Sequence, residues 1–487
     1  MIEALRGLGY STSTALADVI DNSIAANALR VDVSFTWAGA ASRVTIADDG
    51  RGMTPDQLEK AMRLGDHSPL DPRLPGDLGR FGLGLKTASF SQCRRLTVVS
   101  RRQGNVACLR WDLDEIAAAG GRDWELLEGP APGSEDLLSF QPPPGNGTLV
   151  AWEILDRLLT PGFREQDLLD LIDRVERHLA MVFHQYIEGP RARLHITLNG
   201  TRVKPWDPFL TDHRDTWSSP KERFASSSGP VFLQAHVLPH KDRLDARIYQ
   251  DAAGPDGWTA QQGFYVYRQG RLLLGGSWLG LGRGRSWTKE EAHRLARIRV
   301  EIGNASDFAW KIDIRKSTAR PPVEVRARLT ALAEDARDRA RRVFAWRGRN
   351  LVARVTGQPV VQAWAALHTS DSVRYRIDEQ HPAVAAVLQH ATELTPLVRA
   401  MLRVVEETVP VQRIWLDTAE AKDTPQTGFT AGPPAELRQV LEVIYRNLVH
   451  RRGLTPSEAK QRLLLAEPFD AHPDVVAALP DPPASET

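Results

Sequence analysis

Carboxylate and amide side chains recur at helical spacing near the start of the chain. Asp18, Asp21 and Asn22 lie within residues 11–29, and residues three or four positions apart on a helix are neighbours. Apolar residues at the same spacing, such as Leu16, would form the buried side of that helix. An acid and an amide one turn apart can orient a water molecule and hold a cation. A helix face that only contacts solvent has the same pattern, so the motifs that follow are needed to distinguish a ligand site from a solvated surface.

Three further motifs follow at sensible distances. DDGRGM at 48–53 ends a predicted strand, GRFGLGLK at 79–86 opens a predicted helix, and GTLV at 147–150 begins another strand. Backbone N–H groups of a glycine-rich loop at a helix N-terminus can face phosphates, because the helix dipole favours anions there. Each motif alone is weak evidence, whereas the four together and in this order form a specific signature.

The four motifs resemble the N-box, the DxGxG box, the glycine-rich lid box and the GT box of the GHKL ATPases. This superfamily includes gyrase B, the heat-shock-90 chaperones, histidine kinases and MutL. The segments IDNSIAANA and GRFGLGLKTAS are most similar to the MORC-like and MutL-like group, which includes bacterial MORC-like ATPases associated with restriction–modification and phage-defence clusters. The resemblance covers roughly residues 10–330, more loosely in its second half, and it implies ATP and Mg²⁺ as ligands.

The resemblance also implies a role for each matching residue. Asn22 would coordinate Mg²⁺ through its side-chain oxygen, a hard ligand of the kind this ion needs. Asp48 would accept a hydrogen bond from the adenine amine. Lys316 would reach the γ-phosphate from the second domain, with Lys311 and Arg320 as alternatives. The other implied nucleotide-binding positions are Gly50, Gly52, Met53, Gly79, Gly82, Gly84, Leu85, Lys86 and Thr148.

Asp18 departs from the pattern of the superfamily, whose members usually have a glutamate there to orient and deprotonate the attacking water. Aspartate is shorter by one methylene, and general-base catalysis depends on hydrogen-bond reach before it depends on pKa. Ala25 replaces a second acid of many relatives, and Asp21 is expected to be exposed or to cap a neighbour. We therefore expect slow ATP hydrolysis, and a regulatory module that binds nucleotide without turnover stays an alternative.

The elements that position these motifs predict an α+β fold in four regions. Residues 1–189 are expected to form a Bergerat-type α/β sandwich, an antiparallel or mixed sheet with helices on one side. Residues 190–322 are expected to form a second α/β domain that starts with a hairpin near 194–200, and GFYVYRQGRLLLGG resembles the MutL-type, ribosomal-protein-S5-like transducer domain. Residues 323–466 are expected to be mainly helical, and 467–487 a disordered tail.

The composition of the chain limits the ligands and sites that we expect. The 487 residues are 42% hydrophobic and 25% charged, with a net charge of +1, so nucleic-acid binding would need a local patch. The arginine-rich helix expected after residue 323 is one candidate, although such a run is more often a solvated face. Two cysteines, Cys93 and Cys108, predict neither a disulfide framework nor a metal cluster. The chain shows neither a membrane-spanning apolar run nor a leader, so we expect a cytoplasmic protein without membrane contact.

These expectations combine into an ATP-gated conformational clamp. ATP would order the lid at residues 66–78, the ATPase heads would associate as a homodimer, and hydrolysis would release them. Such clamps act on DNA with partner proteins, here in a restriction-like or phage-defence-like system. A chaperone-like ATPase and a topoisomerase subunit are alternatives. A histidine kinase is disfavoured because it needs a dimerisation helix upstream. The sequence names no DNA substrate and no partner protein.

Overall fold

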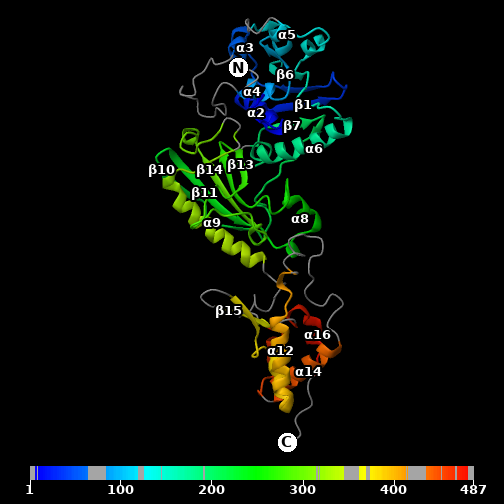
Figure 1. Cartoon of the computed structure of the whole chain (residues 1–487), viewed down its shortest axis with the longest axis vertical. Coiled ribbons are helices and arrows are strands. Elements are labelled where there is room, and N and C mark those ends of the chain that lie inside the picture. Colours follow the sequence, from blue (N-terminus) through cyan, green and yellow to red (C-terminus); the bar gives the residue numbers. More distant parts are fainter. Residues whose placement is uncertain are drawn as a thin grey trace. The chain divides into compact units, whose positions relative to one another are not determined.

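The computed structural model divides the chain into two compact units, Met1–Ala345 and Trp346–Thr487. Figure 1 shows both in sequence colours. The lid expected at residues 66–78, together with Gly79 and Gly82, lies outside the described residues. The described residues are 6–7, 9–63, 84–118, 125–143, 145–189, 192–313, 316, 318–344, 361–368, 373–412, 414, 435–450, 452–466 and 469–480.

A mixed eight-stranded sheet forms the framework of the first half of unit 1, in the order β5-β4-β3-β6-β2-β1-β7-β8. Its neighbouring strands pair antiparallel, except that β1 and β7 are parallel. This is the mixed sheet that the sequence predicted. The strands are β1 (Arg30–Thr36), β2 (Arg43–Asp48), β3 (Arg95–Arg102), β4 (Asn105–Asp112), β5 (Leu127–Glu128), β6 (Gly147–Glu153), β7 (His195–Leu198) and β8 (Thr201–Arg202).

Helices α2, α4 and α6 share one hydrophobic core with this sheet. Helix α2 starts at a capping box, in which the Ser11 side chain accepts a hydrogen bond from the Thr14 N–H. The apolar face of α2, including Leu16 and Ile20, is fully buried, and this leaves its opposite face for polar residues. The helices are α2 (Thr12–Ala25), α3 (Pro55–Met62), α4 (Gly84–Phe90), α5 (Leu113–Ala118), η1 (Glu135–Ser139), α6 (Glu165–Val182) and α7 (His184–Ile187).

The hairpin near residues 194–200 belongs to the first sheet, whereas we expected it to begin the second domain. Strand β7 pairs with β1, with Ile196 opposite Val31, and Leu194, Ile196 and Leu198 are buried in the first core. The physical reason is that β1 would otherwise present a row of unpaired backbone groups at a sheet edge. The first sheet therefore extends beyond residue 189.

The second half of unit 1 is a sheet in the order β10-β11-β14-β12-β13, with β9 beside β11. Strands β12 and β14 are parallel. The strands are β9 (Trp217–Ser218), β10 (Glu222–Ser226), β11 (Gly229–Val237), β12 (Gly263–Arg268), β13 (Arg271–Ser277) and β14 (Ala296–Ile302). The helices are η2 (Lys241–Arg243), α8 (Ala246–Ala253), η3 (Glu291–His293), η4 (Asn304–Ser306) and α9 (Val323–Phe344).

Helix α9, the arginine-rich helix, packs along this second sheet (Figure 1), although we expected it to open the C-terminal helical region. The reason is its buried apolar side, which includes Val325, Leu329 and Ala336. Several of its arginines have protein partners. Arg337 lies over the rings of Trp278 and Trp287, and Arg328 forms an ion pair with Glu222.

Unit 2 is mainly helical, as the sequence predicted, around a small core of its own. The tail expected at 467–487 is in part folded, because Phe469, Val476 and Leu479 are buried in that core. The elements are β15 (Trp364–His368), β16 (Val373–Ile377), α11 (Pro382–His390), η5 (Thr392–Leu394), α12 (Thr395–Glu407), α14 (Ala435–His450), α15 (Pro456–Leu463), η6 (Phe469–Ala471) and α16 (Pro473–Ala477). Among the residues described, no helix combines the length and apolarity needed to cross a bilayer.

Gly52 lies where the segment after β2 crosses β3. Its φ is +64°, and a Cβ there would lie 2.0 Å from the Arg101 carbonyl oxygen. Gly39 has a similar φ of +57°, with nothing within 4 Å of its Cβ position. Both sites carry the same backbone penalty for alanine, but only Gly52 adds a steric one.

We expect Gly52→Ala to lower the free energy of unfolding by about 3 kcal/mol or more, since backbone strain and overpacking add. Gly39→Ala should cost about 1 kcal/mol, from the left-handed backbone alone. Urea unfolding of both variants measures the difference. Equal losses would contradict the close approach at Gly52.

Candidate functional site

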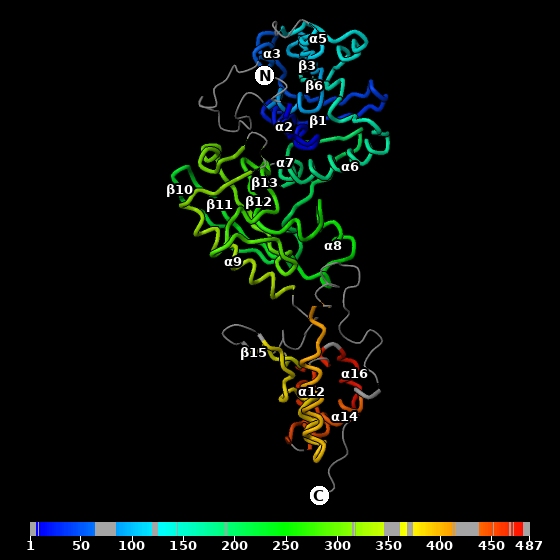
Figure 2. The backbone as a smooth tube through the Cα atoms, viewed as in Figure 1, coloured from blue at the N-terminus to red at the C-terminus, as the bar shows by residue number. Residues whose placement is uncertain are grey.

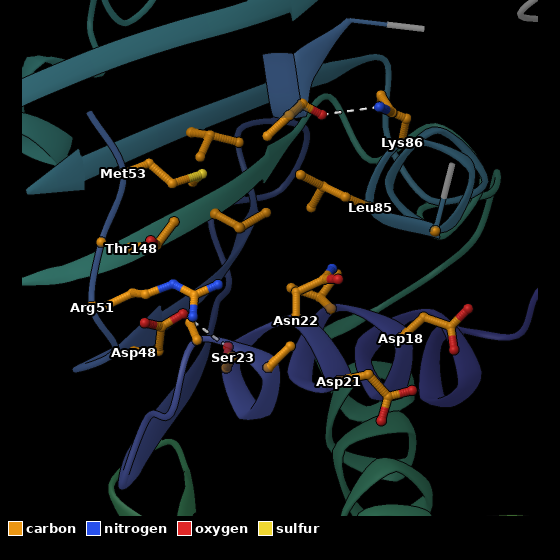
Figure 3. Close-up of a pocket in the computed structure, with 18 of the residues that line it drawn as sticks. Asp18, Asp21, Asn22, Ser23, Asp48, Arg51, Met53, Leu85, Lys86 and Thr148 are labelled. Atoms are coloured by element: carbon orange, nitrogen blue, oxygen red, sulfur yellow. Dashed lines mark hydrogen bonds between the residues drawn. The ribbon is translucent and has the colours of Figure 1, made fainter. Parts of the chain in front are cut away.

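A cavity of about 420 Å³ lies beside the polar face of α2. Figure 3 shows its walls, which come from α2, the segment after β2, α4 and β6. Gly50 is not among its lining residues, and Gly79 and Gly82 lie outside the described part of the chain. The residues singled out from the sequence that line the cavity are Asp18, Asn22, Asp48, Gly52, Met53, Gly84, Leu85, Lys86, Thr148 and Lys316.

Asn22 lies at the middle of the cavity wall that α2 provides (Figure 3). Its side chain is exposed, and within the described ranges its amide has no hydrogen-bond partner. The side-chain oxygen is therefore free to serve as a hard ligand. No group of three or more His, Cys, Asp or Glu side chains that could hold a metal occurs among the described residues. Mg²⁺ needs no such cage, since one or two protein ligands suffice when phosphates supply the rest. Asn22 thus fits an Mg²⁺ held jointly with a phosphate ligand.

Asp48 forms the opposite end of the cavity and is held by three elements. Its Oδ2 accepts a hydrogen bond from Ser23 Oγ at 2.8 Å, and its Oδ1 accepts one from the Gly50 N–H at 2.9 Å. Burial raises the pKa of Asp48, and the hydrogen bonds from Gly50, Ser23 and the Thr148 backbone oppose that rise. A fixed acceptor in a low-dielectric pocket suits recognition of an exocyclic amine.

The hydrogen bond from Ser23 to Asp48 was not predicted from the sequence. The available signal was a hydroxyl among the apolar positions of the helix, directly after Asn22. Gly50 acts through its backbone, because its N–H orients Asp48. A Cβ on Gly50 would lie 2.9 Å from both the Ala26 Cβ and the Asp48 carboxylate.

Strand β6 begins with Gly147 and lies directly against the backbone of Asp48. A Cβ on Gly147 would lie 2.1 Å from the Asp48 carbonyl oxygen. The Ser100 hydroxyl then links the two neighbours of Asp48: it accepts a hydrogen bond from the Met53 N–H at 2.8 Å and lies 3.2 Å from Thr148 Oγ1. Asp48, Met53 and Thr148 are therefore fixed relative to one another.

Lys86, one of the implied nucleotide-binding positions, is buried and bonded within the protein. Its Nζ donates hydrogen bonds to the carbonyl oxygens of Ala61, at 2.9 Å, and Arg63. These carbonyls end α3, so Lys86 ties α4 to α3 (Figure 3). Its ammonium faces the C-terminal end of a helix, where the helix dipole favours a cation.

Asp21, which we expected to be exposed or to cap a neighbour, is buried. Its side chain is 1% exposed and pairs with Arg271 and Lys316. Asp18, one turn earlier, is bound by the same two cations, with Lys316 Nζ at 2.9 Å and Arg271 Nη2 at 3.4 Å. Tyr10 also donates a hydrogen bond to Asp18. No local pattern in the sequence marked Arg271.

The hairpin β12–β13 brings Arg271 to the first domain. Its turn has positive φ at Gln269 and Gly270, as tight hairpins require. Tyr186 Oη donates a hydrogen bond to the Gln269 carbonyl at 2.7 Å, and His184 Nε2 lies 2.8 Å from Tyr267 Oη. Figure 2 shows β13 beside α7. The two halves of unit 1 are therefore docked at this turn.

Lys316 is the member of the three proposed cations that lines the cavity. Arg320 lines a separate cavity beside β13 and α9, and Lys311 lines neither of the two. Geometry therefore favours Lys316 as the second-domain residue that can reach a ligand held by α2.

Comparisons with known proteins match part of the chain to a family of ATPases. Residues 10–139 match the family model described as "Histidine kinase-, DNA gyrase B-, and HSP90-like ATPase". The DNA mismatch repair protein MutL of Rhodospirillum rubrum is 33% identical over 276 residues, which are 53% of this chain and 38% of that protein. MutL of Halobacterium salinarum is 39% identical over 93 residues, covering 18% of this chain and 14% of that protein.

A third relative is ATPase morc-1 of Caenorhabditis elegans, which is 27% identical over 96 residues, or 20% of this chain and 11% of that protein. The chain thus spans about two fifths, or less, of the length of these curated relatives. The matched region contains α2, Asp48 and α4, whereas β6 and Lys316 lie beyond residue 139.

Ser23→Ala should weaken binding of adenosine diphosphate about fivefold to tenfold, because a buried carboxylate loses a donor. Loss of that donor disfavours the charged form, so the pKa of Asp48 should rise further. The decline of affinity toward acid pH should therefore begin at a higher pH than in the wild type. Calorimetric titration across the acid range measures both effects. The control is Ser42→Ala, which changes a buried serine between β1 and β2. If the affinity of Ser23→Ala falls at the same acid pH as that of the wild type, Ser23 is not the donor that stabilises the Asp48 carboxylate.

Proposed function

We propose that this chain, which belongs through residues 10–139 to the GHKL ATPase superfamily with MutL-like and MORC-like relatives, binds Mg-ATP beside α2 and hydrolyses it slowly. One observation carries this proposal: a single cavity is lined by Asp48, Asn22, Asp18 and Lys316. These residues are an acceptor for adenine, a ligand for Mg²⁺, a candidate base and a cation for the terminal phosphate.

The arrangement gives the nucleotide one direction in the cavity. Adenine would lie at Asp48, Met53 and Thr148, where Met53 offers an apolar contact beside the fixed carboxylate. The phosphates would run past Asn22 toward Asp18 and Lys316. A cation from the second domain at the far end would distinguish ATP from ADP, because only the terminal phosphate of ATP would reach it.

Hydrolysis would use Asp18 as general base. A water aligned with the γ-phosphorus would give its proton to a carboxylate oxygen of Asp18, while the bond from that phosphorus to the bridging oxygen breaks and ADP leaves. When bound, Mg²⁺ neutralises charge on the phosphate oxygens. Lys316 would stabilise the transferring group electrostatically. We expect a low rate because the aspartate side chain is short and both its oxygens already accept hydrogen bonds from protein donors.

The same features favour a second candidate function, a regulatory module that binds nucleotide without turnover. Both oxygens of Asp18 are engaged by Tyr10 and Lys316, so a water must compete for the base. The two functions differ only in whether bound ATP is cleaved. A chaperone-like ATPase would differ from both in binding unfolded protein.

The finer role is proposed from the relatives. Two of them are DNA mismatch repair proteins by name, and we propose that ATP drives this chain as a clamp in a DNA-related, restriction-like or phage-defence-like system. The lid would close over ATP, two ATPase heads would pair as a homodimer, and hydrolysis would separate them. The docked hairpin β12–β13 would carry the change at the phosphates to the second sheet.

Asp18→Asn should lower the rate of ATP hydrolysis at least about 100-fold, as expected for loss of a general base, and leave ADP affinity within about threefold. Asn22→Ala should instead remove the Mg²⁺ dependence of nucleotide affinity. Phosphate release and calorimetry with and without Mg²⁺ measure both. Asp173→Asn, exposed on α6, is the matched control. Residual turnover in Asp18→Asn equal to that of the wild type would remove Asp18 as base.

Contact between α9 and duplex DNA should appear as a steep loss of affinity with salt. Arg342 is exposed, whereas Arg328 is paired with Glu222. Arg342→Gln should reduce the slope of log affinity against log salt by about one, and Arg328→Gln by less. Fluorescence anisotropy at several salt concentrations measures the slopes. An affinity insensitive to salt would exclude α9 as a phosphate-contacting surface.

A further inference from the structure

Two acids and two cations meet at the end of the cavity where the γ-phosphate would lie. Asp18 and Asp21 come from one face of α2, Arg271 from the start of β13, and Lys316 from the segment before α9. All four side chains are at most 9% exposed. The cluster therefore pairs two negative charges with two positive charges away from bulk water.

Asp21 has no part in the proposed hydrolysis, yet it is the most deeply buried member of the cluster. Burial alone would raise its pKa, but the charges of Arg271 and Lys316 together lower it. Asp21 therefore stays ionised. A buried carboxylate needs such partners, because an unpaired charge in the interior costs several kcal/mol.

The two cations are held differently. Arg271 is anchored within its own hairpin, since its Nη1 donates a hydrogen bond to the Leu272 carbonyl at 2.8 Å, while its Nε lies 3.2 Å and 3.3 Å from the two carboxylate oxygens of Asp21. By contrast, the Lys316 Nζ donates its hydrogen bonds to Asp18 and Asp21 on α2, across the contact between the two halves of unit 1. An ammonium on a flexible stem can also change partners more easily than a planar guanidinium.

Lys316 is in addition strained in this position. Its φ is +54°, a left-handed conformation that costs a side-chain-bearing residue about 1–2 kcal/mol. Such strain persists only where surrounding contacts impose it. The ionic contacts with Asp18 and Asp21, and a turn hydrogen bond that the Lys316 N–H donates to the Asp313 carbonyl at 3.0 Å, hold it there. Lys316 is thus the member of the cluster best suited to leave.

We propose that Asp21 is a positioning residue that holds Lys316 beside Asp18 until a γ-phosphate competes for the ammonium, while Arg271 keeps both carboxylates in place after the transfer. This inference rests on the proposed function, since it assumes that nucleotide occupies the cavity. ATP must then break the Lys316–Asp21 contact to bind, whereas ADP need not. The same transfer frees an acceptor position on Asp18 Oδ1 for the attacking water.

The test is a cycle of four proteins: wild type, Asp21→Asn, Lys316→Ala and the double variant. The quantity measured is the ratio of the affinities for the non-hydrolysable analogue AMP-PNP and for ADP, by calorimetry with Mg²⁺. Asp21→Asn should raise the preference for AMP-PNP about tenfold, within the usual range of coupling between sites. In the Lys316→Ala background the same substitution should leave the ratio unchanged within about twofold, because no lysine remains to be released.

The cycle distinguishes competition for Lys316 from the general effect of removing a negative charge near the phosphates. Removing a negative charge near the phosphates strengthens phosphate binding in both backgrounds, whereas competition for Lys316 acts only where Lys316 is present. Asp173→Asn, with its exposed carboxylate on α6, is the control for the substitution itself. An equal change of the ratio in both backgrounds, or no change in either, would overturn the proposal.

Arg271→Gln supplies a second test in the opposite direction. With Arg271 neutralised, the two carboxylates retain Lys316 as their ion-pair partner, so they should hold it more tightly and the preference for AMP-PNP should fall. A purely structural role for Arg271 predicts equal weakening of both nucleotides, which would overturn the proposal even if Asp21→Asn did not fold. A wild type that binds neither nucleotide defeats the proposed function as well, whereas normal wild-type binding with unshifted ratios defeats the present inference alone.

Discussion

The pairing of two carboxylates on α2 with two cations from the second sheet domain is the interaction on which the site depends. Asp18 and Asp21 are both buried, and a buried carboxylate without a cationic partner is strongly destabilising. Arg271 and Lys316 make them stable only when the hairpin β12–β13 and the segment before α9 are docked. The cavity is therefore completed by two domains, and a ligand that draws on Lys316 acts on the contact between them.

The two ends of the cavity differ in rigidity for physical reasons. At the end proposed for adenine, Asp48 is held by Ser23 and by the Gly50 N–H, and Gly147 allows β6 to lie directly against its backbone. At the end proposed for the phosphates, the contacts are ionic and include a lysine in a left-handed backbone conformation. Hydrogen bonds within the first half of unit 1 thus hold one end of the cavity, whereas ion pairs between the two halves of unit 1 hold the other.

Several features of the fold could be predicted because they depend on local pattern. The helical spacing of residues 11–29 predicted α2, and alternation of apolar residues predicted the strands around Asp48. The boundary between the first two domains was misplaced because strand pairing joins β7 to β1, which is about 165 residues away. Helix α9 was assigned to the wrong region since its arginines are more conspicuous in sequence than the narrow apolar stripe that buries it against the second sheet.

The sequence by itself determined several residues of the cavity: four short motifs, each local in the chain, singled out Asn22, Asp48, Gly52, Gly84 and Thr148. They pointed to a superfamily whose model matches residues 10–139. Only the tertiary structure decided that Asp21 is buried, that Ser23 orients Asp48, and that Arg271 belongs to the cluster. The reason is separation. Arg271 and Asp21 are 250 residues apart, and no periodicity or motif encodes a pairing that exists only once two domains have folded and docked.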